Sequence, residues 1–176
     1  HSSPARFDMK KLEAINGDKI RALSAEEFLN RALPFLKEAE VITGTNEEIA
    51  LVKQALPIIQ ERIVKLGEIP AMLKFLFVDE LVIDSESKEK IKDDLSKDVL
   101  KRALEVLEPL GTWSHDSIES VLRAALIEDM GLKPRIAFGA VRIAATGSHI
   151  SPPLFESMEL LGKDASISRI KAAISL

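Results

Sequence analysis

Residues 46–67, NEEIALVKQALPIIQERIVKLG, show the pattern that decides the fold. Asn46 can act as an N-cap, and the two glutamates that follow it are favourable beside the positive end of a helix dipole. Apolar residues then recur every three or four positions, which is the period of an amphipathic helix. The predicted buried stripe is Val52, Ala55, Leu56, Ile59, Ile63 and Leu66. Gly67 is the predicted end of this helix, and Pro57 predicts a kink or a break inside it.

Further helices are predicted on both sides of this segment, where apolar residues recur with the same helical period. Ser24 and Glu27 have the spacing of a capping box and predict a helix that begins there. Ser114 is a predicted N-cap, and Ser151-Pro152 predicts a helix with Pro152 in its first turn. Glycines suited to helix ends follow the later helical patterns at Gly131, Gly147 and Gly162. Phe75 to Ile83 is too short to classify by period and is interpreted as an extended connector.

Composition supports an all-α protein. Of the 176 residues, 46% are hydrophobic, 30% are charged and only 5% are aromatic, with eight glycines and eight prolines. A sandwich or barrel normally uses more aromatic, β-branched and turn residues. The polar segment 84–90 is interpreted as a boundary, so we predict a two-lobed helical fold with lobes 1–84 and 85–176.

Several function classes find no support in the sequence. There is no cysteine, and the phosphate-binding loop, the dinucleotide-binding glycines, the His-Glu-x-x-His zinc motif and the Gly-x-Ser-x-Gly elbow are all absent. No apolar run is long enough to span a membrane. The histidines lack metal-ligand spacing, and His149 is interpreted as an exposed loop residue. The first residues, His1 to Ser3, look like a tag remnant, which suggests a fragment of a longer chain.

Blocks of sequence resemble the C-terminal region of bacterial glutamyl-tRNA synthetases, and the resemblance extends over nearly the whole chain. The C-terminal blocks are the most specific, whereas residues 84 to 112 are weakly characteristic. Two positions depart from the family pattern: Ala14, where a large residue is usual, and Ala140, where proline is usual. The blocks are Arg6–Asp8, Lys10–Leu12, Asn16-Gly17, Gly131–Arg135, Val141–Gly147, Ile150–Glu156 and Met158–Lys163.

The resemblance implies an α-helix cage that binds the anticodon of tRNA-Glu. It implies a cytoplasmic protein, expected to be monomeric, whose catalytic domain belongs to the same chain but lies outside this sequence. ATP and magnesium would belong to that missing domain, so no catalytic residue, cofactor or metal ligand is expected here. The formal net charge of −4 is unusual for a nucleic-acid binder, so contact would depend on local basic patches.

The resemblance also suggests residues that contact the anticodon. Arg142 is the strongest candidate, because guanidinium presents a planar fork of donors to a base edge or phosphate. Ser151, Pro152, Leu154 and Phe155 would lie at a helix start, where free backbone N–H groups favour a polar base edge or phosphate, and the apolar side chains would form a pocket wall. Arg142 could instead be an ion-paired surface arginine, and Leu154 and Phe155 could instead be core residues.

Three further cations are candidates. Arg62 resembles the residue that reads the first anticodon base in the family, although it could equally pair with neighbouring acids. Lys133 and Arg135 are candidates for phosphate contact, since neutralising the RNA backbone requires only positive charge beside it. The alternative interpretation of Lys133 and Arg135 is that they lie in a solvated loop without a binding role.

Three functional hypotheses follow. The first is anticodon recognition within a glutamate–tRNA ligase. The second is a helical protein-interaction module that binds no RNA, which the net negative charge favours mildly. The third is a non-discriminating enzyme that also charges tRNA-Gln, which would need a less selective pocket for the first anticodon base.

Overall fold

The computed structural model describes residues 8–176, and every regular element in that range is helical, as predicted. Arg6, Phe7 and the segment His1 to Ser3, to which two of the sequence interpretations refer, lie outside the described residues. The chain divides into two compact units, one ending at Lys74 and one comprising Phe75–Leu176. The predicted boundary at residue 84 falls inside the second unit, and the assignment of 1–84 and 85–176 as functional lobes stays a prediction.

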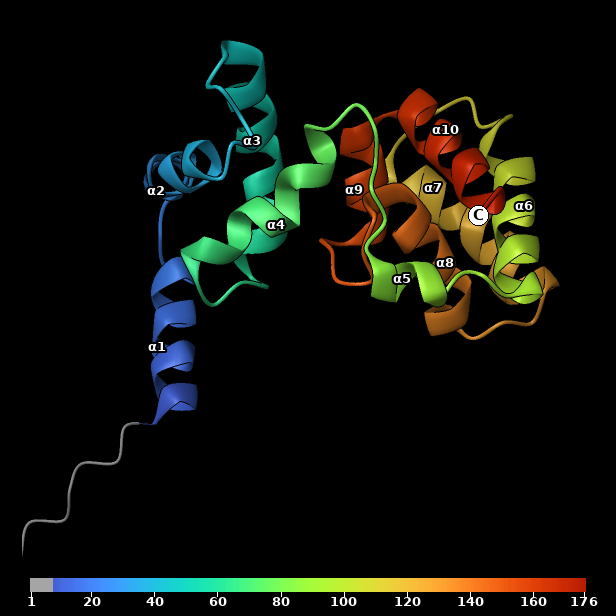
Figure 1. The fold of residues 1–176 in the computed structure, drawn as a ribbon, viewed down its shortest axis with the longest axis horizontal. Helices are drawn as coiled ribbons and strands as arrows, with labels where there is room; N and C mark the ends of the chain where they lie inside the picture. Colours follow the sequence, from blue (N-terminus) through green and yellow to red (C-terminus); the bar gives the residue numbers. More distant parts are fainter. Residues whose placement is uncertain (1–7) are drawn as a thin grey trace, which may run out of the picture. The chain divides into compact units, whose positions relative to one another are not determined.

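The first unit packs α2 against α3 and α4 (Figure 1). Its elements are α1 (Met9–Arg21), α2 (Ala25–Glu38), α3 (Asn46–Gln60), η1 (Leu66–Glu68) and α4 (Ile69–Leu73), and η2 (Lys74–Leu76) follows. Phe28, Leu36, Ile59 and Leu73 are among its fully buried side chains. Burying apolar faces of this kind is what holds short helices together in water.

The predicted start of α2 is confirmed, and that of α3 is shifted by one residue. Ser24 and Glu27 form a capping box. At α3 the N-cap is Thr45 instead of Asn46, because Glu48 stands three residues after Thr45 and bonds back to its amide to complete a second capping box.

The helix predicted to begin at Asn46 differs from α3 in two respects. It continues through Pro57, so the predicted break is wrong, since the buried residues on either side keep the chain packed against its neighbours. The kink, the other alternative at Pro57, stays a prediction. The helix also ends at Gln60, well before Gly67. The reason lies in Glu68, whose carboxylate accepts hydrogen bonds from the amides of Val64 (3.1 Å) and Lys65 (2.8 Å) and so favours a separate short turn.

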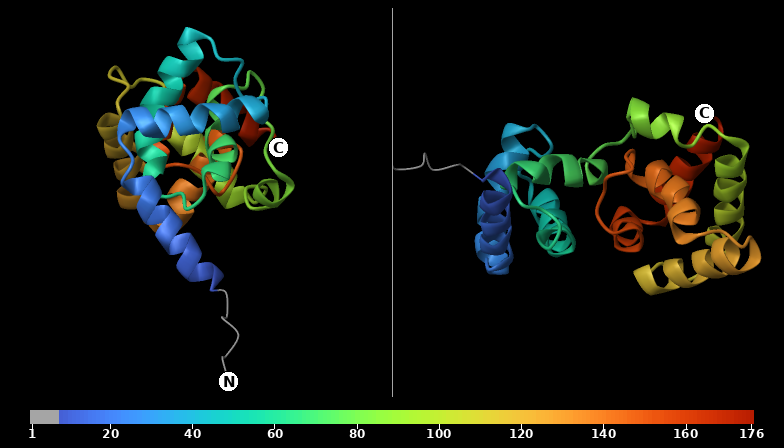
Figure 2. Two further views of the ribbon diagram at one scale, coloured as in Figure 1. Left: turned by 90° about the vertical axis from the view of Figure 1, so that its left-hand side faces the viewer. Right: turned by 90° about the horizontal axis from the view of Figure 1, so that it is seen from below.

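The second unit, whose helices Figure 2 shows from two further sides, is built around a single apolar cluster. Its helices are α5 (Ser85–Glu89), α6 (Asp94–Leu107), α7 (His115–Leu122), the π-helical η3 (Arg123–Asp129), α8 (Pro134–Thr146), α9 (Leu154–Leu161) and α10 (Lys163–Ile174). Helix α10 packs against α6, α8 and α9, and α7 packs against α9. Residues 77–84 precede α5 without regular structure, so the predicted connector is confirmed over 77–83. Its first two residues, Phe75 and Leu76, instead belong to the helical turn η2.

Two of the glycines predicted at helix ends, Gly147 and Gly162, do follow helices of the second unit. Gly147 follows α8 with φ 83° and Gly162 follows α9 with φ 89°, a region of backbone space that L side chains rarely adopt. The helix predicted to begin with Pro152 instead begins at Leu154, after Pro153 as N-cap. This prediction is wrong because Pro153 restricts the residue before it to extended conformations, which keeps Pro152 out of a helix.

Candidate nucleic-acid interface

Arg142 organises the loop that follows α8. Its Nη1 donates hydrogen bonds to the Ser151 hydroxyl (2.7 Å) and to the Pro152 carbonyl (2.8 Å). The Ser151 hydroxyl also donates to the Pro152 carbonyl at 3.0 Å. Helix α8 presents this side chain because its opposite face, which includes Ala137, Val141 and Ala144, is buried in the core. The structure therefore brings these three candidate residues into direct contact, with Ser151 buried, and their role at an anticodon stays a prediction.

A groove of about 630 Å³ opens beside Arg142. One wall comes from α8, where Arg135, Phe138, Gly139 and Arg142 line the space, and the opposite wall comes from the segment between α5 and α6 and the start of α6. The complete lining is Lys90, Asp93, Leu95, Ser96, Pro134, Arg135, Ile136, Phe138, Gly139, Ala140, Arg142, Ile143 and His149.

The groove combines cations with exposed apolar side chains. Lys90, Arg135 and Arg142 line it together with one carboxylate, Asp93. Leu95 and Ile136, also in the lining, are 44% and 48% exposed. Positive groups beside apolar walls suit an unpaired nucleotide, which presents both a charged phosphate and a flat base.

The two predicted phosphate-contacting residues occupy different positions. Lys133 is the exposed N-cap of α8. Arg135 is exposed within the first turn of α8, so its predicted location in a loop is wrong: Pro134, preset for helical φ, starts the helix one residue earlier. Only Arg135 lines the groove that contains Arg142.

The predicted pocket wall is more buried than the sequence suggested. Leu154 is 3% exposed and belongs to the core cluster. Phe155 is half-buried and meets Phe138 edge to face, with ring centroids 5.2 Å apart and an interplanar angle of 86°. Because Phe138 lines the groove and Phe155 does not, Phe155 supports the wall from behind. The guanidinium of Arg123 lies 5.4 Å from the Phe138 ring centroid, a cation–π contact.

Arg62 belongs to the first unit. It is exposed, it directly follows Glu61, the C-cap of α3, and its amide bonds to the Ile59 carbonyl. Within residues 8–176 no ion pair of its side chain is observed, and its role at the first anticodon base stays a prediction.

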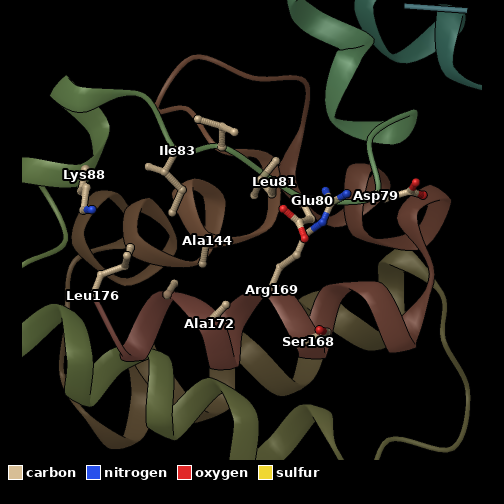
Figure 3. Close-up of a pocket in the computed structure, with 12 residues that line it drawn as sticks. Asp79, Glu80, Leu81, Ile83, Lys88, Ala144, Ser168, Arg169, Ala172 and Leu176 are labelled. Carbon is tan, nitrogen blue, oxygen red and sulfur yellow. The ribbon is translucent and has the colours of Figure 1, made fainter.

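A second hollow, of about 520 Å³, lies where the connector 79–83 crosses α8 and α10 (Figure 3). Arg169 of α10 points up to the connector, donating to the carbonyls of Val78 (3.0 Å) and Ala145 (2.9 Å). Burial lowers the pKa of this guanidinium. Sequence reasoning missed this residue, because nothing in a helical period shows which charged position will meet a carbonyl from a distant segment.

Within the described range, no group of three His, Cys, Asp or Glu side chains is arranged to hold a metal ion. No helix in that part of the chain combines the length and the apolar character needed to cross a membrane.

The fold is that of a helical domain with a groove lined by cationic and apolar side chains. The chain belongs to the anticodon binding domain family, which matches residues 27–174, so the resemblance found in the sequence is confirmed. It is 49% identical to the glutamate–tRNA ligase of Paenarthrobacter aurescens over 97% of its own length, and 49% identical to that of a Nocardioides species over 98%. It spans about a third of those relatives, 34% and 36% of their length.

Solved structures show the same fold at low sequence identity. A glutamate tRNA ligase from Elizabethkingia meningosepticum, crystallised in complex with its amino acid, covers 99% of this chain at a TM-score of 0.75 and 22% identity. A glutamate-tRNA synthetase from Elizabethkingia anophelis covers 100% at a TM-score of 0.73 and 21% identity. The chain corresponds to 34% and 33% of those proteins.

Proposed function

We propose that this chain recognises the anticodon of tRNA-Glu as the anticodon-binding part of a glutamate–tRNA ligase. The observation that supports this most directly is the double role of Arg142, which fixes the Ser151–Pro152 loop and also lines an open cationic groove. Membership of the anticodon binding domain family gives the groove its proposed ligand. ATP, magnesium and the acylation step would belong to a catalytic part outside this chain.

Anticodon bases suit such a groove because they lie in a single-stranded loop. They can be splayed out, stacked and hydrogen-bonded along their edges. The guanidinium of Arg142 can recognise a base edge or a phosphate, and an arginine contact of this kind is worth about 1–3 kcal/mol of discrimination. Its link to the Ser151–Pro152 loop makes the loop conformation part of the recognition.

The other predicted residues take supporting positions in this proposal. Arg135 and Lys133 neutralise phosphates at the start of α8, while Arg62 reads the first anticodon base from the first unit. Ser151 and Pro152 shape the loop beside Arg142. Leu154 and Phe155 keep α9 and the groove wall rigid from their buried positions. A cytoplasmic, monomeric ligase is the expected setting.

The test is a titration of the chain with a fluorescent anticodon stem-loop of tRNA-Glu at low salt. We expect saturable binding that weakens as salt rises, and a loss of roughly tenfold or more in Arg142→Ala. Because Arg142→Ala also frees the loop, Arg135→Ala provides a second variant that breaks no loop hydrogen bond. Arg102→Ala is the matched control, since Arg102 pairs with Glu105 and Asp129 and does not line the groove.

A helical protein-interaction module is the competing function, and the net charge of −4 favours it. The same titration separates the two. Absence of binding at low salt, or equal binding of Arg142→Ala and wild type, would exclude anticodon recognition by this groove. Misacylation of tRNA-Gln by the complete ligase would show whether recognition is non-discriminating.

A further inference from the structure

His149 lines the groove, although nothing in the sequence indicated a function for it. It lies in the loop after α8, two residues beyond Gly147, and its side chain is 32% exposed. It lines the same groove as Arg135 and Arg142. Its sequence interpretation as an exposed loop histidine is therefore incomplete, because its ring is held in a defined place.

Ser87 of α5 holds this histidine at two points. The Ser87 hydroxyl accepts a hydrogen bond from the His149 amide at 2.9 Å and lies 3.0 Å from the His149 Nδ1. The same hydroxyl lies 2.8 Å from Asp84 Oδ2, and the Ser87 amide donates to Asp84 Oδ1 at 2.8 Å. Ser87 is completely buried, so these hydrogen bonds are shielded from solvent and fix the position of the His149 ring.

The hydrogen bonds among Asp84, Ser87 and His149 determine whether His149 Nδ1 carries a proton. A hydroxyl has one proton to donate, and an ionised carboxylate can only accept. These hydrogen bonds, from the Ser87 amide first and then the Ser87 hydroxyl, hold the pKa of Asp84 below its usual value, so this carboxylate is ionised. The Ser87 proton therefore goes to Asp84, and His149 Nδ1 must itself carry a proton and donate it to Ser87.

The other ring nitrogen, Nε2, has no hydrogen bond to any described residue. Glu86 approaches it at 3.6 Å, but the Glu86 carboxylate is engaged at 2.7 Å by Lys90. The charged groups around the ring are thus Asp84, Glu86 and Lys90 on the side of α5, Asp93 before α6, and Arg135 and Arg142 on α8. With Nδ1 anchored, Nε2 is the atom left for a ligand.

We propose that His149 is a further RNA-contacting residue, which donates from Nε2 to a phosphate oxygen of the strand bound in the groove. This inference rests on the proposed function. Since Nδ1 is already protonated, a donating Nε2 makes the ring a cation, and a phosphate favours that form. Asp84 and Ser87 are positioning residues in this scheme, because they orient the ring without touching the RNA.

Two substitutions separate contact from loop anchoring. The amide nitrogen of asparagine can replace Nδ1 toward Ser87 but does not reach the place of Nε2, whereas the longer glutamine side chain can reach it. We expect His149→Asn to weaken stem-loop binding roughly three- to tenfold, the effect of one lost hydrogen bond, and to reduce the salt slope by about 1. We expect His149→Gln to regain part of the affinity. His115→Asn is the matched control, because His115 lies on α7, pairs with Glu159 and is absent from the groove lining.

Ser87→Ala tests the positioning role. Nitrogen-resolved NMR of the imidazole should show a protonated Nδ1 in the wild type, and loss of its hydrogen bond to Ser87 in the variant. Combining Ser87→Ala with His149→Asn should weaken binding by less than the sum of the two separate effects.

The outcomes distinguish this inference from the proposed function. If the wild type binds and Arg142→Ala weakens binding, while His149→Asn binds like the wild type, the histidine contact is overturned and anticodon binding stands. An unchanged salt slope in His149→Asn also overturns the phosphate contact. If the wild type does not bind the stem-loop at all, both proposals fail.

Discussion

The Nη1 atom of Arg142 lies 2.7 Å from the Ser151 hydroxyl, across nine positions of sequence and the left-handed turn at Gly147. A second bond from the same nitrogen reaches the Pro152 carbonyl. One side chain therefore fixes the loop between α8 and α9 and also faces the groove. A substitution in the loop should therefore alter the position of the Arg142 side chain, and a substitution of Arg142 should alter the conformation of the loop.

Ser151→Ala removes one of these two acceptors. The variant also loses the hydrogen bond that the Ser151 hydroxyl donates to the Pro152 carbonyl. We expect a loss of about 1–3 kcal/mol in stability, since each of the two hydrogen bonds is worth about 0.5–1.5 kcal/mol, with faster amide exchange confined to residues 148–152. Thermal unfolding and hydrogen exchange measure the two effects. Ser168→Ala is the control, since Ser168 is exposed on α10 and its hydroxyl bonds to no described residue. Unaltered exchange in the loop would mean that the Pro152 carbonyl alone holds Arg142.

Gly147→Ala should destabilise the second unit by about 2–5 kcal/mol. The left-handed φ of 83° costs roughly 1–2 kcal/mol for a residue with a Cβ. The added Cβ would also stand 2.9 Å from the Val82 carbonyl oxygen and 3.1 Å from the Leu81 Cδ1, and crowding of this kind costs about 1–3 kcal/mol.

Gly139→Ala is the matched comparison within the same helix. Gly139 has open space where a Cβ would be added, and it lies inside α8. We expect a gain of about 0.5–1 kcal/mol from the higher helix propensity of alanine. Melting temperatures of the two variants should therefore move in opposite directions, and a shared direction would contradict the backbone argument.

Local chemistry explains which parts of this fold were predictable. Ser24 with Glu27, and the glycines at 147 and 162, act through neighbours within four residues, so sequence alone located them. The start of α9 was predictable as well, had the restriction that Pro153 places on Pro152 been weighed against the preference of proline for a first turn. Thr45 would likewise have been preferred to Asn46 on the position of Glu48.

Features that depend on distant partners were not predictable. The π-helical turn over Arg123–Asp129 changes the hydrogen-bond register without any proline or glycine inside it. The anchoring of His149 by Ser87 joins residues 62 positions apart, and the Arg169 bond to Val78 joins residues 91 apart. For the candidate site, sequence and resemblance identified Arg142 and Arg135, but only coordinates show that they share one groove.

Glu48 should titrate far below an ordinary glutamate. Backbone hydrogen bonds, first from Thr45 and then from Gly44, lower the pKa of its carboxyl from 4.5 to about 2. Because the folded pKa is depressed, the stabilisation is complete above the unfolded value and is lost as the pH falls toward 2. Carbon-detected NMR should give the low pKa directly. Glu48→Gln should flatten the acid limb of the stability profile, whereas Glu47→Gln, at the exposed neighbouring position, should not.

His115 should respond to pH in the opposite sense. Its hydrogen bond to Glu159, at 3.0 Å between α7 and α9, raises the pKa of the imidazole above 6.5. A raised folded pKa gives a stabilisation that is present below the unfolded pKa and disappears as the pH rises through the folded one. His115→Gln should therefore reduce the melting temperature at pH 5.5 more than at pH 8.5. Equal losses at both pH values would show that the charge plays no part.

Arg169 should hold the connector onto the second unit. Its guanidinium bonds the carbonyls of Val78 and Ala145 from inside the hollow shown in Figure 3. Arg169→Met keeps most of the apolar stem and removes the donors, so two half-buried carbonyls lose a charged partner. We expect a loss of about 1–3 kcal/mol and faster exchange of the amides of residues 79–83.

The control is Arg102→Met, which removes the two exposed ion pairs that Arg102 of α6 forms with Glu105 and Asp129. Such pairs are worth about 0–1 kcal/mol each. Equal losses of stability in the two variants would contradict this prediction, as would unchanged amide exchange in the connector without Arg169. The hydrogen bond from the Asp84 amide to the Gly147 carbonyl would then be what holds the connector to the second unit.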